Sequence, residues 1–297
     1  MLGGFGGIAP RAQPVFRQAL LVLSAAFAAA ALPGAQAAPR PVPSFDHVVV
    51  IVFENKVRGS VLGSSAAPTF NSLAKRYAVL AGYRGVTHPS LPNYLALVSG
   101  STQGITNNCT SCTTGGRSLA DTLEAEGRTW KAYAEGLPRA GWTGVASGRY
   151  VKRHVPLLYF RRVLSRPARV RNVVALTALS RDLAAKRLPD FALVVPDMCH
   201  DMHDCRVSTG DAWLARFLPP LLHSHQLANS AVFVIFDESD STDPRVAALA
   251  LGPLVRPGSR FAPTMSHYGL LRTIEDAWGL SRLGRSARVG PATGIWR

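Results

Sequence analysis

The chain has 297 residues, of which 47% are hydrophobic and only 17% are charged. This composition excludes an intrinsically disordered protein and allows one large domain or two smaller ones. Lys and Arg number 33 against 18 Asp and Glu, and this net charge of +15 favours anionic partners without selecting among phosphate esters, nucleic acids, acidic lipids and acidic proteins.

The first 37 residues have the three-part pattern of a secretory signal. Two arginines precede an apolar run over residues 19–32, and the small-residue sequence 35–37 follows it. We predict cleavage after Ala37, so that residues 38–297 form an exported domain, secreted or periplasmic. A membrane anchor is the alternative, but the run is shorter than the ~20 apolar residues that span a bilayer. Cleavage would remove the two arginines and leave a net charge of +13.

The predicted exported domain contains an even set of four cysteines. They are Cys109, Cys112, Cys199 and Cys205. An even number in an exported protein predicts disulfides, and we favour the two local pairings because each pair lies within one loop. A zinc site formed by all four thiolates is the alternative, although nothing in the spacing requires the four to converge.

Apolar runs and helical patterns alternate along the domain. Such alternation predicts a doubly wound α/β fold, a single domain with a mostly parallel central sheet flanked by helices. The segment 136–172 lacks clean periodicity and is expected to be an insertion beside the site. In chain order, we predict a strand over residues 48–53, helices over 69–79, from 90 onward, over 118–126 and over 173–187, strands over 191–195 and 231–236, and a helix over 266–278.

Polar residues follow each of the three predicted strands. Glu54 and Asn55 follow the first strand, a loop rich in Asp and His follows the second, and Asp237 and Glu238 follow the third. In an open α/β sheet the ligand crevice lies beyond the carboxyl ends of the strands, so we expect these groups to gather at one edge. The pattern therefore predicts a polar site there.

One predicted helix begins with a serine. In the segment THPSLPNY, Ser90 stands immediately before the apolar residues of this helix. Backbone N–H groups and the dipole at a helix start bind anions, so Ser90 is placed where a phosphoryl group could bind. The alternative is that Ser90 merely caps the helix, and the segment alone does not decide between the two.

Several motifs together resemble the phosphoesterase family, which includes secreted acid phosphatases and bacterial phospholipases C and is related to the alkaline phosphatase superfamily. They lie between Phe45 and about Leu283 and include HVVVIVFEN, THPSLPNYLALVSGSTQGIT, KRHVPLLYF, DMHDC, VFVIFDESD and SHYGLLRTIEDAWGL. The resemblance implies an alkaline-phosphatase-like fold and a hydrolase of phosphoric esters. The chain looks most like the small secreted acid phosphatases, some of which act on phosphatidylinositol phosphates.

Carried over residue by residue, the resemblance implies one divalent metal ion and a serine nucleophile. The implied metal ligands are Glu54, Asn55, Ser90, Asp237 and Glu238. Hard oxygen ligands suit Mg, Ca or Mn at least as well as Zn. Ser90 is also the implied nucleophile, which would form a phosphoserine intermediate because a bound cation stabilises its alkoxide.

The resemblance also implies side chains that bind the phosphoryl group. Asn93 would donate its amide to a non-bridging oxygen, and our hypothesis is that His154 and His267 bind the phosphoryl oxygens as well. His154 lies in the insertion, and His267 lies at the start of the last predicted helix.

A histidine in the loop after the second predicted strand is the candidate general acid. Our hypothesis is that His203, oriented by Asp201 or Asp204, protonates the leaving group. Two alternatives stay open: His200 and His203 could exchange roles, and this cluster could itself bind a metal.

The leading prediction is a monomeric, secreted, metal-dependent acid phosphatase whose substrate is a small phosphate monoester or a phospholipid headgroup. A phospholipase C-type phosphodiesterase, which would differ only in the shape of its pocket, or a phosphoinositide phosphatase is the alternative. A non-catalytic cationic binding protein is a third, because residues 139–181 contain ten Lys or Arg and no acid. Since no helix-turn-helix or zinc-finger signature accompanies them, we expect no specific nucleic acid and interpret the charge as attraction of phosphorylated substrates or of anionic membrane surfaces.

Overall fold

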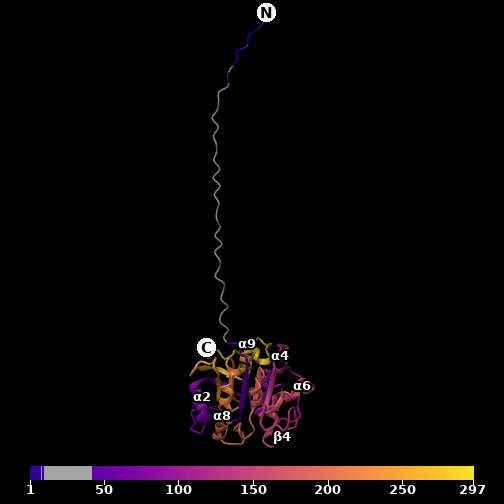
Figure 1. Cartoon of the computed structure of the whole chain (residues 1–297), viewed down its shortest axis with the longest axis vertical. Coiled ribbons are helices and arrows are strands. Elements are labelled where there is room, and N and C mark those ends of the chain that lie inside the picture. Colours follow the sequence, from indigo (N-terminus) through magenta and orange to yellow (C-terminus); the bar gives the residue numbers. More distant parts are fainter. Residues whose placement is uncertain (8, 10–41) are drawn as a thin grey trace. The chain divides into compact units, whose positions relative to one another are not determined.

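The computed structural model describes residues 1–7, 9 and 42–297, and an eight-stranded sheet forms the centre of the domain over residues 42–297 (Figure 1). Its strand order is β10-β2-β9-β8-β1-β7-β3-β6. The strands are β1 Val48–Phe53, β2 Ala78–Arg84, β3 Trp130–Ala134, β6 Val173–Ala175, β7 Phe191–Val195, β8 Ala231–Phe236, β9 Ala248–Leu251 and β10 Arg260–Ser266. Within this sheet only the pairings of β9 with β2 and β8 are antiparallel, so the predicted mostly parallel sheet is confirmed.

The three strands predicted from apolar runs lie side by side in the middle of the sheet. β1 pairs with β7 on one side and with β8 on the other, and Val48 is in register with both Phe191 and Ala231. Every residue of these three strands is buried. A strand covered on both faces needs apolar side chains at consecutive positions, which explains why their bounds are readable as continuous runs of Val, Ile and Phe.

The helices pack in two separate groups. Helix α3 contacts α4 and α9, whereas α2 contacts α8, and Figure 1 shows α2 and α8 together, away from α4 and α6. Because the central strands are buried on both faces, this grouping fits a sheet flanked by helices. The helices are α1 Arg58–Val61, α2 Pro68–Arg76, α3 Ser90–Ser99, α4 Leu119–Ala125, α5 Arg161–Leu164, α6 Pro167–Val170, α7 Ala178–Ala184, α8 Val207–Leu222 and α9 His267–Trp278.

Several segments differ from the predicted elements. The helix predicted over residues 69–79 ends at Arg76, and its last two residues belong to strand β2. Like β2, the strands β3, β9 and β10 are not predicted. The helix predicted over residues 173–187 is wrong at its start, where the β-branched pair Val173 and Val174 forms strand β6 beside β3 and only α7 is helical. Helix α8 is not predicted at all. It contains Pro219 and Pro220, and proline argues against a helix interior because it lacks the N–H group.

The segment 136–172 consists of short elements that reach the loop after β7. A hairpin of β4 (Ala146–Ser147) and β5 (Tyr150–Val151) precedes the 3₁₀ turns η1 (Lys152–His154) and η2 (Pro156–Tyr159). The N–H group of Met198, in the loop after β7, donates to the carbonyl oxygen of Arg149 at 3.1 Å. The hairpin thus lies against the loop that contains the candidate general acid.

Both local cysteine pairings are confirmed. Cys109 pairs with Cys112 across a Cα–Cα distance of 5.8 Å, and Cys199 pairs with Cys205 across 4.7 Å. The described part of the chain contains no free cysteine, so no thiolates remain to form the alternative zinc site.

The apolar run and the cleavage site of the predicted signal lie outside the described residues. Among the helices that are described, none is long and apolar enough to cross a membrane.

A buried carboxylate ties helix α9 to the segment that follows it. Glu275 accepts hydrogen bonds from the Leu283 N–H group at 2.9 Å and from Ser286 Oγ at 2.6 Å. Burial raises the pKa of Glu275 to about 7. A carboxyl group whose pKa is higher in the folded than in the unfolded chain stabilises the fold at low pH, and this contribution is lost as the pH rises toward 7 and beyond.

We therefore expect the difference in the free energy of unfolding between Glu275→Gln and the wild type to shift in favour of the variant when the pH rises from 5 to 8. Glutamine still accepts the hydrogen bond from Leu283 but cannot become a buried anion. The shift from the usual carboxyl pKa corresponds to a relative gain of about 1 to 3 kcal/mol in the free energy of unfolding. Denaturant unfolding of both proteins at the two pH values measures this gain, and an identical difference at pH 5 and pH 8 would contradict it.

Candidate active site

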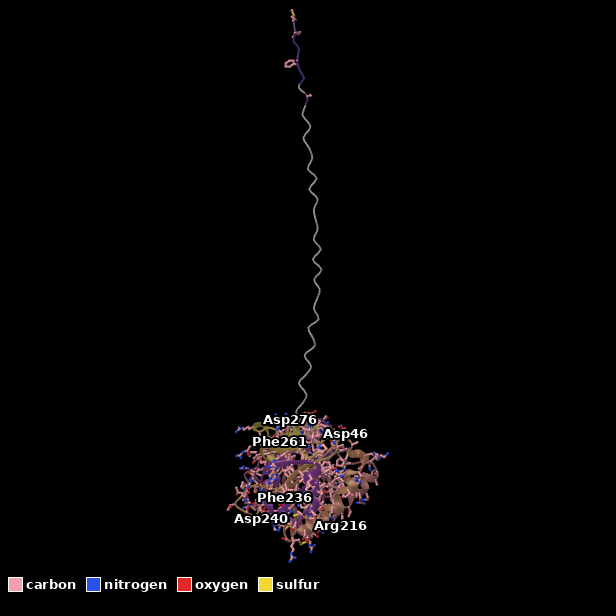
Figure 2. All side chains as sticks on the ribbon, turned by 90° about the vertical axis from the view of Figure 1, so that its left-hand side faces the viewer. Asp46, Arg216, Phe236, Asp240, Phe261 and Asp276 are labelled. Atoms are coloured by element: carbon pink, nitrogen blue, oxygen red, sulfur yellow. A yellow bond between two sulfur atoms is a disulfide. The ribbon has the colours of Figure 1, made fainter. Side chains whose placement is uncertain are left out.

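The predicted polar residues meet at the carboxyl edge of the sheet. Glu54 follows β1, Ser90 begins the helix that follows β2, and Asp237 follows β8. These three strands are parallel to one another, so the residues after them emerge at the same edge. Figure 2 shows Asp240, three residues after Asp237, at the opposite end of the domain from Asp46, which precedes β1.

The hydroxyl group of Ser90 lies between two carboxylates. Ser90 Oγ is 2.9 Å from Glu54 Oε2 and 3.2 Å from Glu238 Oε1, so its single proton can be donated to either. Pro89 precedes the helix, and no side-chain hydrogen bond caps α3. The alternative that Ser90 merely caps the helix is therefore wrong. Its side chain is turned into the acidic cluster instead.

Only some carboxylate oxygens of the cluster receive a hydrogen bond. The Asn55 N–H group donates to Asp237 Oδ1 at 3.1 Å. The backbone of Asn55 is left-handed (φ 50°), a conformation that asparagine tolerates. Glu54 Oε1 and Asp237 Oδ2 are buried and complete no hydrogen bond, although His154 Nε2 lies 3.2 Å from Glu54 Oε1 without the geometry of one. Buried anionic oxygens without donors are costly, because nothing in the protein replaces the water they have lost.

The carboxylates also perturb one another's ionisation. Burial, and then the charges of Asp237 and Asp201, raise the pKa of Glu54 well above its usual range. Burial raises the pKa of Asp237 to about 6, and burial together with the charge of Asp237 raises the pKa of Glu238 to about 8. A divalent cation would satisfy the unpartnered oxygens and relieve this repulsion. The structure thus brings together the five residues predicted to hold a metal: Glu54, Asn55, Ser90, Asp237 and Glu238.

Asn93 holds the loop that precedes the serine. Its Oδ1 accepts from the N–H groups of Val86 at 2.7 Å and Thr87 at 3.2 Å, and its Nδ2 donates to the carbonyl oxygen of Thr87 at 2.7 Å. The same Nδ2 lies 3.4 Å from Glu238 Oε2. Asn93 therefore fixes the backbone before Ser90 and places its amide beside the acidic cluster.

The position of His154 corrects its predicted role. The ring is fully buried, with Nε2 3.2 Å from Glu54 Oε1 and Nδ1 3.2 Å from Asp201 Oδ2, and it stacks on Tyr94. Burial lowers the pKa of His154 well below its usual value and raises that of Asp201 to about 8. Because both ring nitrogens face carboxylates, His154 belongs inside the acidic cluster and does not present a nitrogen to phosphoryl oxygens in this structure.

The position of His267 also corrects its predicted role. Its Nε2 lies 2.6 Å from the backbone oxygen of Asp237, and its Nδ1 lies 2.9 Å from the hydroxyl of Tyr83. The ring is buried, which lowers the pKa of His267 to about 4. Both nitrogens are already engaged, so His267 supports the backbone of a predicted metal ligand and is not placed to bind the phosphoryl group.

His203 is partly exposed and contacts both aspartates that were predicted to orient it. Its Nδ1 lies 2.7 Å from Asp204 Oδ1, and its backbone N–H group donates to Asp201 Oδ1 at 2.8 Å. This leaves Nε2 as the ring nitrogen available for proton transfer. The disulfide between Cys199 and Cys205 closes the loop that contains all three residues.

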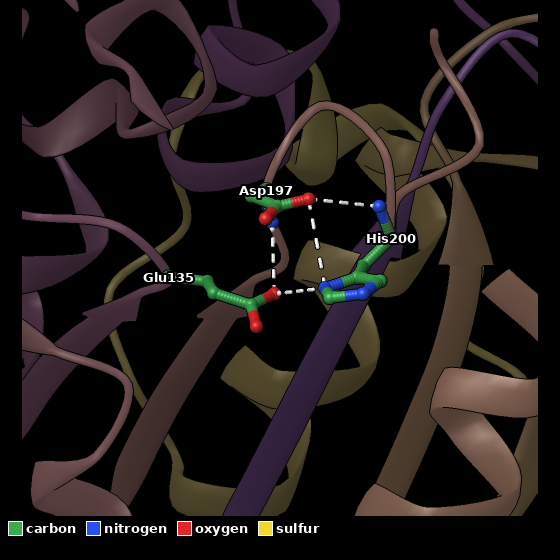
Figure 3. A group of neighbouring side chains, drawn as sticks. All are labelled: Glu135, Asp197 and His200. Carbon is green, nitrogen blue, oxygen red and sulfur yellow. Dashed lines mark hydrogen bonds and ion pairs between the residues drawn. The ribbon is translucent and has the colours of Figure 1, made fainter. Parts of the chain in front are cut away.

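His200 belongs to a different group of side chains. Figure 3 shows its ring beside Glu135 and Asp197, with Nδ1 3.0 Å from Glu135 Oε2 and 3.5 Å from Asp197 Oδ1. The ligand atoms of these three residues lie within 4.8 Å of one another. Asp197 Oδ1 already accepts from the N–H groups of Cys199 and His200, both at 2.9 Å. His200 and His203 are thus held by different carboxylates.

Two residues of the site were not singled out from the sequence. His88 Nδ1 lies 2.7 Å from Glu238 Oε2, although the His88 side chain is 60% exposed. The hydroxyl of Tyr94 is buried without a hydrogen-bond partner, and the Tyr94 ring covers His154. Both residues lie in the segment THPSLPNY around Ser90, so their position in that motif could have identified them as site residues.

Comparisons with known proteins identify the family of the chain. The sequence model of the Phosphoesterase family matches residues 60–281. Phosphatidylinositol-3-phosphatase of Mycobacterium tuberculosis is 36% identical over 270 residues, which cover 90% of this chain and 88% of that protein. An acid phosphatase of Aspergillus fumigatus is 30% identical over 227 residues, which cover 72% of this chain and 51% of that protein. The chain belongs to the Phosphoesterase family, as its motifs predict, and so to the hydrolases that act on phosphoric ester bonds.

Solved structures with the same architecture are distant in sequence. A protein of the alkaline phosphatase superfamily from Vibrio parahaemolyticus superposes with a TM-score of 0.58 at 13% identity, covering 86% of this chain and 72% of that chain. The lipoteichoic acid synthase LtaP from Listeria monocytogenes gives a TM-score of 0.59 at 12% identity, covering 82% and 74%. These similarities confirm the predicted alkaline-phosphatase-like fold.

Proposed function

We propose that the protein is an exported, metal-dependent acid phosphatase that hydrolyses phosphate monoesters through a phosphoserine intermediate at Ser90. The position of the Ser90 hydroxyl, shared between Glu54 and Glu238 at the first residue of α3, is the observation on which the proposal depends. A serine hydroxyl attacks only after it loses its proton, and both neighbouring carboxylates can accept one. The acid phosphatases and the phosphatidylinositol-3-phosphatase among the relatives support a monoester substrate.

The acidic cluster fits the divalent metal that the family resemblance implies. Glu54, Asn55, Ser90, Asp237 and Glu238 would hold it, and the unpartnered atoms Glu54 Oε1 and Asp237 Oδ2 support this assignment. When bound, such a cation stabilises the serine alkoxide and polarises a phosphoryl oxygen. Oxygen ligands of this kind suit Mg, Ca or Mn at least as well as Zn.

The residues of the chain account for each proton in the reaction. Ser90 passes its proton to Glu54 Oε2 or Glu238 Oε1, and Ser90 Oγ bonds to phosphorus in line with the ester bond that breaks. The protonated His203, held at Nδ1 by Asp204, donates the Nε2 proton to the leaving oxygen. The neutral His203 then takes a proton from the water that attacks the phosphoserine. The bond between phosphorus and Ser90 Oγ breaks, inorganic phosphate leaves, and the carboxylate that accepted the first proton returns it to Ser90 Oγ.

Export of the protein is supported by two features. The first 37 residues have the pattern of a secretory signal, and two disulfides close local loops of the domain. Disulfides persist in oxidising compartments, so the purified protein is best assayed without reducing agent.

A chromogenic aryl phosphate tests metal dependence and phosphatase activity together. We expect the purified protein to release inorganic phosphate, a chelator to abolish this release, and one of Mg, Ca, Mn or Zn to restore it. Full activity in a preparation shown by elemental analysis to be free of metal would contradict the proposal. A phospholipid diester assayed in parallel distinguishes the phospholipase C alternative, which would release a phosphorylated headgroup instead.

Replacing His203 with alanine is expected to slow substrates with poor leaving groups far more than those with good ones. General acid catalysis contributes about 10² to 10⁴ in rate when the leaving oxygen needs a proton, and much less when it does not. The kcat for an alkyl phosphate should therefore fall by about 10²-fold or more, and that for a nitrophenyl phosphate by a smaller factor. His200→Ala is the matched control, because His200 is held by Glu135 instead. Equal losses for both substrates would remove His203 from this role.

A further inference from the structure

The loop that follows helix α3 returns to the start of that helix through Asn108. The side-chain oxygen Asn108 Oδ1 accepts a hydrogen bond from the N–H group of Leu91 at 2.9 Å, and the Leu91 nitrogen is bonded to the carbonyl carbon of Ser90. A backbone N–H group can only donate, so the atom of the amide that faces it must be the oxygen. This contact therefore fixes the orientation of the Asn108 amide.

The side chain of Asn108 lies over the N-terminal end of α3. The N–H groups of the first turn point out of a helix at this end, and an anion that binds there lies on the same side. The residue after Leu91 is Pro92, which has no N–H group, so the first turn offers fewer backbone donors than an ordinary helix. A phosphoryl group on Ser90 would thus lie beside the Asn108 amide, at a helix end where donors are few.

The three side chains that were predicted to bind the phosphoryl group direct their nitrogens to the protein. Asn93 Nδ2 donates to the Thr87 carbonyl oxygen at 2.7 Å. The ring nitrogens of His154 and His267 lie close to oxygen atoms of other residues. In contrast, Asn108 is exposed, and its Nδ2 donates to no acceptor within the described residues. Asn108 therefore has a free donor group beside Ser90.

A disulfide and a buried lysine hold the loop around Asn108. The bond between Cys109 and Cys112 begins at the next residue, and Lys152 Nζ donates to the Thr110 carbonyl oxygen inside this short loop at 2.6 Å. Lys152 is only 9% exposed and belongs to η1, which packs on α3. A donor stabilises a transition state most when it is already in position before the reaction, and these contacts provide such preorganisation.

We propose that Asn108 is a further catalytic residue, whose Nδ2 group donates a hydrogen bond to a non-bridging oxygen of the phosphoryl group on Ser90. Its Oδ1 atom stays on the Leu91 N–H group and holds the donor in place. The hydrogen bond stabilises the charge on the phosphoryl oxygen in the transition state. This inference rests on the proposed function of Ser90, and it gives a role to a loop that the proposed mechanism does not otherwise use.

Replacement of Asn108 with aspartate or with alanine tests the two polar atoms of the amide separately. Aspartate keeps an oxygen for the Leu91 N–H group but places a negative charge where the donor was, whereas alanine removes both atoms. At pH 7, where an aspartate is ionised, we expect Asn108→Ala to lower kcat for an aryl phosphate by about 10²-fold, as for the loss of one transition-state donor. Asn108→Asp should lower it at least as much.

Thermal unfolding of the same two variants should give the opposite order. Asn108→Asp should be as stable as the wild type, because a carboxylate at a helix start accepts hydrogen bonds from N–H groups and interacts favourably with the helix dipole. Asn108→Ala should be less stable, because the Leu91 N–H group loses its acceptor. Low activity in the more stable variant would show that the loss of kcat does not come from a disturbed fold.

The neighbouring Asn107 is the matched control. It is also exposed, and its side chain makes no hydrogen bond to the described part of the chain. Asn107→Asp adds the same charge one residue away and should keep kcat within about threefold of the wild type. Elemental analysis should find the same metal content in all three variants, since neither asparagine is a predicted ligand.

Two results would overturn the proposal. Wild-type activity in Asn108→Asp together with a loss in Asn108→Ala would mean that Asn108 only holds the start of α3. Equal losses in Asn107→Asp and Asn108→Asp would mean that a negative charge anywhere near the site lowers activity.

Failure of this inference is distinguishable from failure of the proposed function. If Ser90→Ala is inactive while Asn108→Asp keeps wild-type activity, only the role of Asn108 is wrong. If Ser90→Ala retains full activity on the aryl phosphate, the proposed function is wrong as well.

Discussion

Replacing Ser90 with alanine is expected to lower kcat for aryl phosphate hydrolysis by ~10³-fold or more, because the variant has no oxygen to form the phosphoserine. The remaining activity would come from direct attack by water on a bound ester. A phosphate-release assay measures the loss. Mass spectrometry of acid-quenched wild-type enzyme should also detect a phosphorylated peptide containing residue 90, and the variant should lack it.

The same helix offers a matched control for this substitution. Ser99 is the last residue of α3, is also buried, and donates its hydroxyl to the Leu95 carbonyl oxygen at 2.7 Å. Ser99→Ala removes a hydroxyl group from the other end of the helix, so it should cost some stability but leave kcat within about threefold. If Ser90→Ala behaved like Ser99→Ala, Ser90 could not be the nucleophile.

Replacing Glu54 with glutamine is expected to remove the bound metal and to lower kcat/KM by about 10²-fold or more, because a neutral amide is a weaker ligand than a carboxylate. Glu54 contributes the oxygen Oε2 that contacts Ser90 and the unpartnered oxygen Oε1. Elemental analysis of the purified variant and titration with the metal that restores wild-type activity measure the two effects. The bound metal and the activity should be lost together.

Glu135 is the matched control for Glu54. Each glutamate follows a parallel strand of the sheet, Glu54 after β1 and Glu135 after β3, but Glu135 contacts His200 and not Ser90. Glu135→Gln should therefore keep the metal and most of the activity. The opposite result, with metal lost only from Glu135→Gln, would place the metal in the group of Glu135, Asp197 and His200 drawn in Figure 3.

The parts of the fold that could be predicted are those whose physical cause is local in sequence. Strands β1, β7 and β8 are buried on both faces, so their apolar residues are consecutive and visible. Strand β9 reads Ala-Leu-Ala-Leu, a run that suits a helix equally well, and β10 exposes several of its residues. The positions of these two strands depend on pairing with β2, which is distant in sequence.

The contacts of the candidate site also divide into those that could be predicted from the sequence and those that could not. Residues that directly follow a buried strand, such as Glu54 and Asp237, could be predicted to meet, because parallel strands end at one edge. The side chains that contact a histidine ring could not be predicted in this way. The Tyr83 hydroxyl that contacts His267 lies 184 residues away in the chain, and Asp201 meets His154 where the loop after β7 contacts the insertion. Ring orientation is therefore a property of tertiary packing.

The disulfide between Cys199 and Cys205 links the chemistry of the site to the place where the protein is folded. It closes the short loop that holds His203, Asp201 and Asp204, and closing a loop removes much of the conformational freedom of the chain within it. In a reducing cytoplasm this bond does not persist, and the loop is then free to move. In the proposed mechanism this disulfide restricts the loop of the general acid, and under the proposed export it would form outside the cytoplasm.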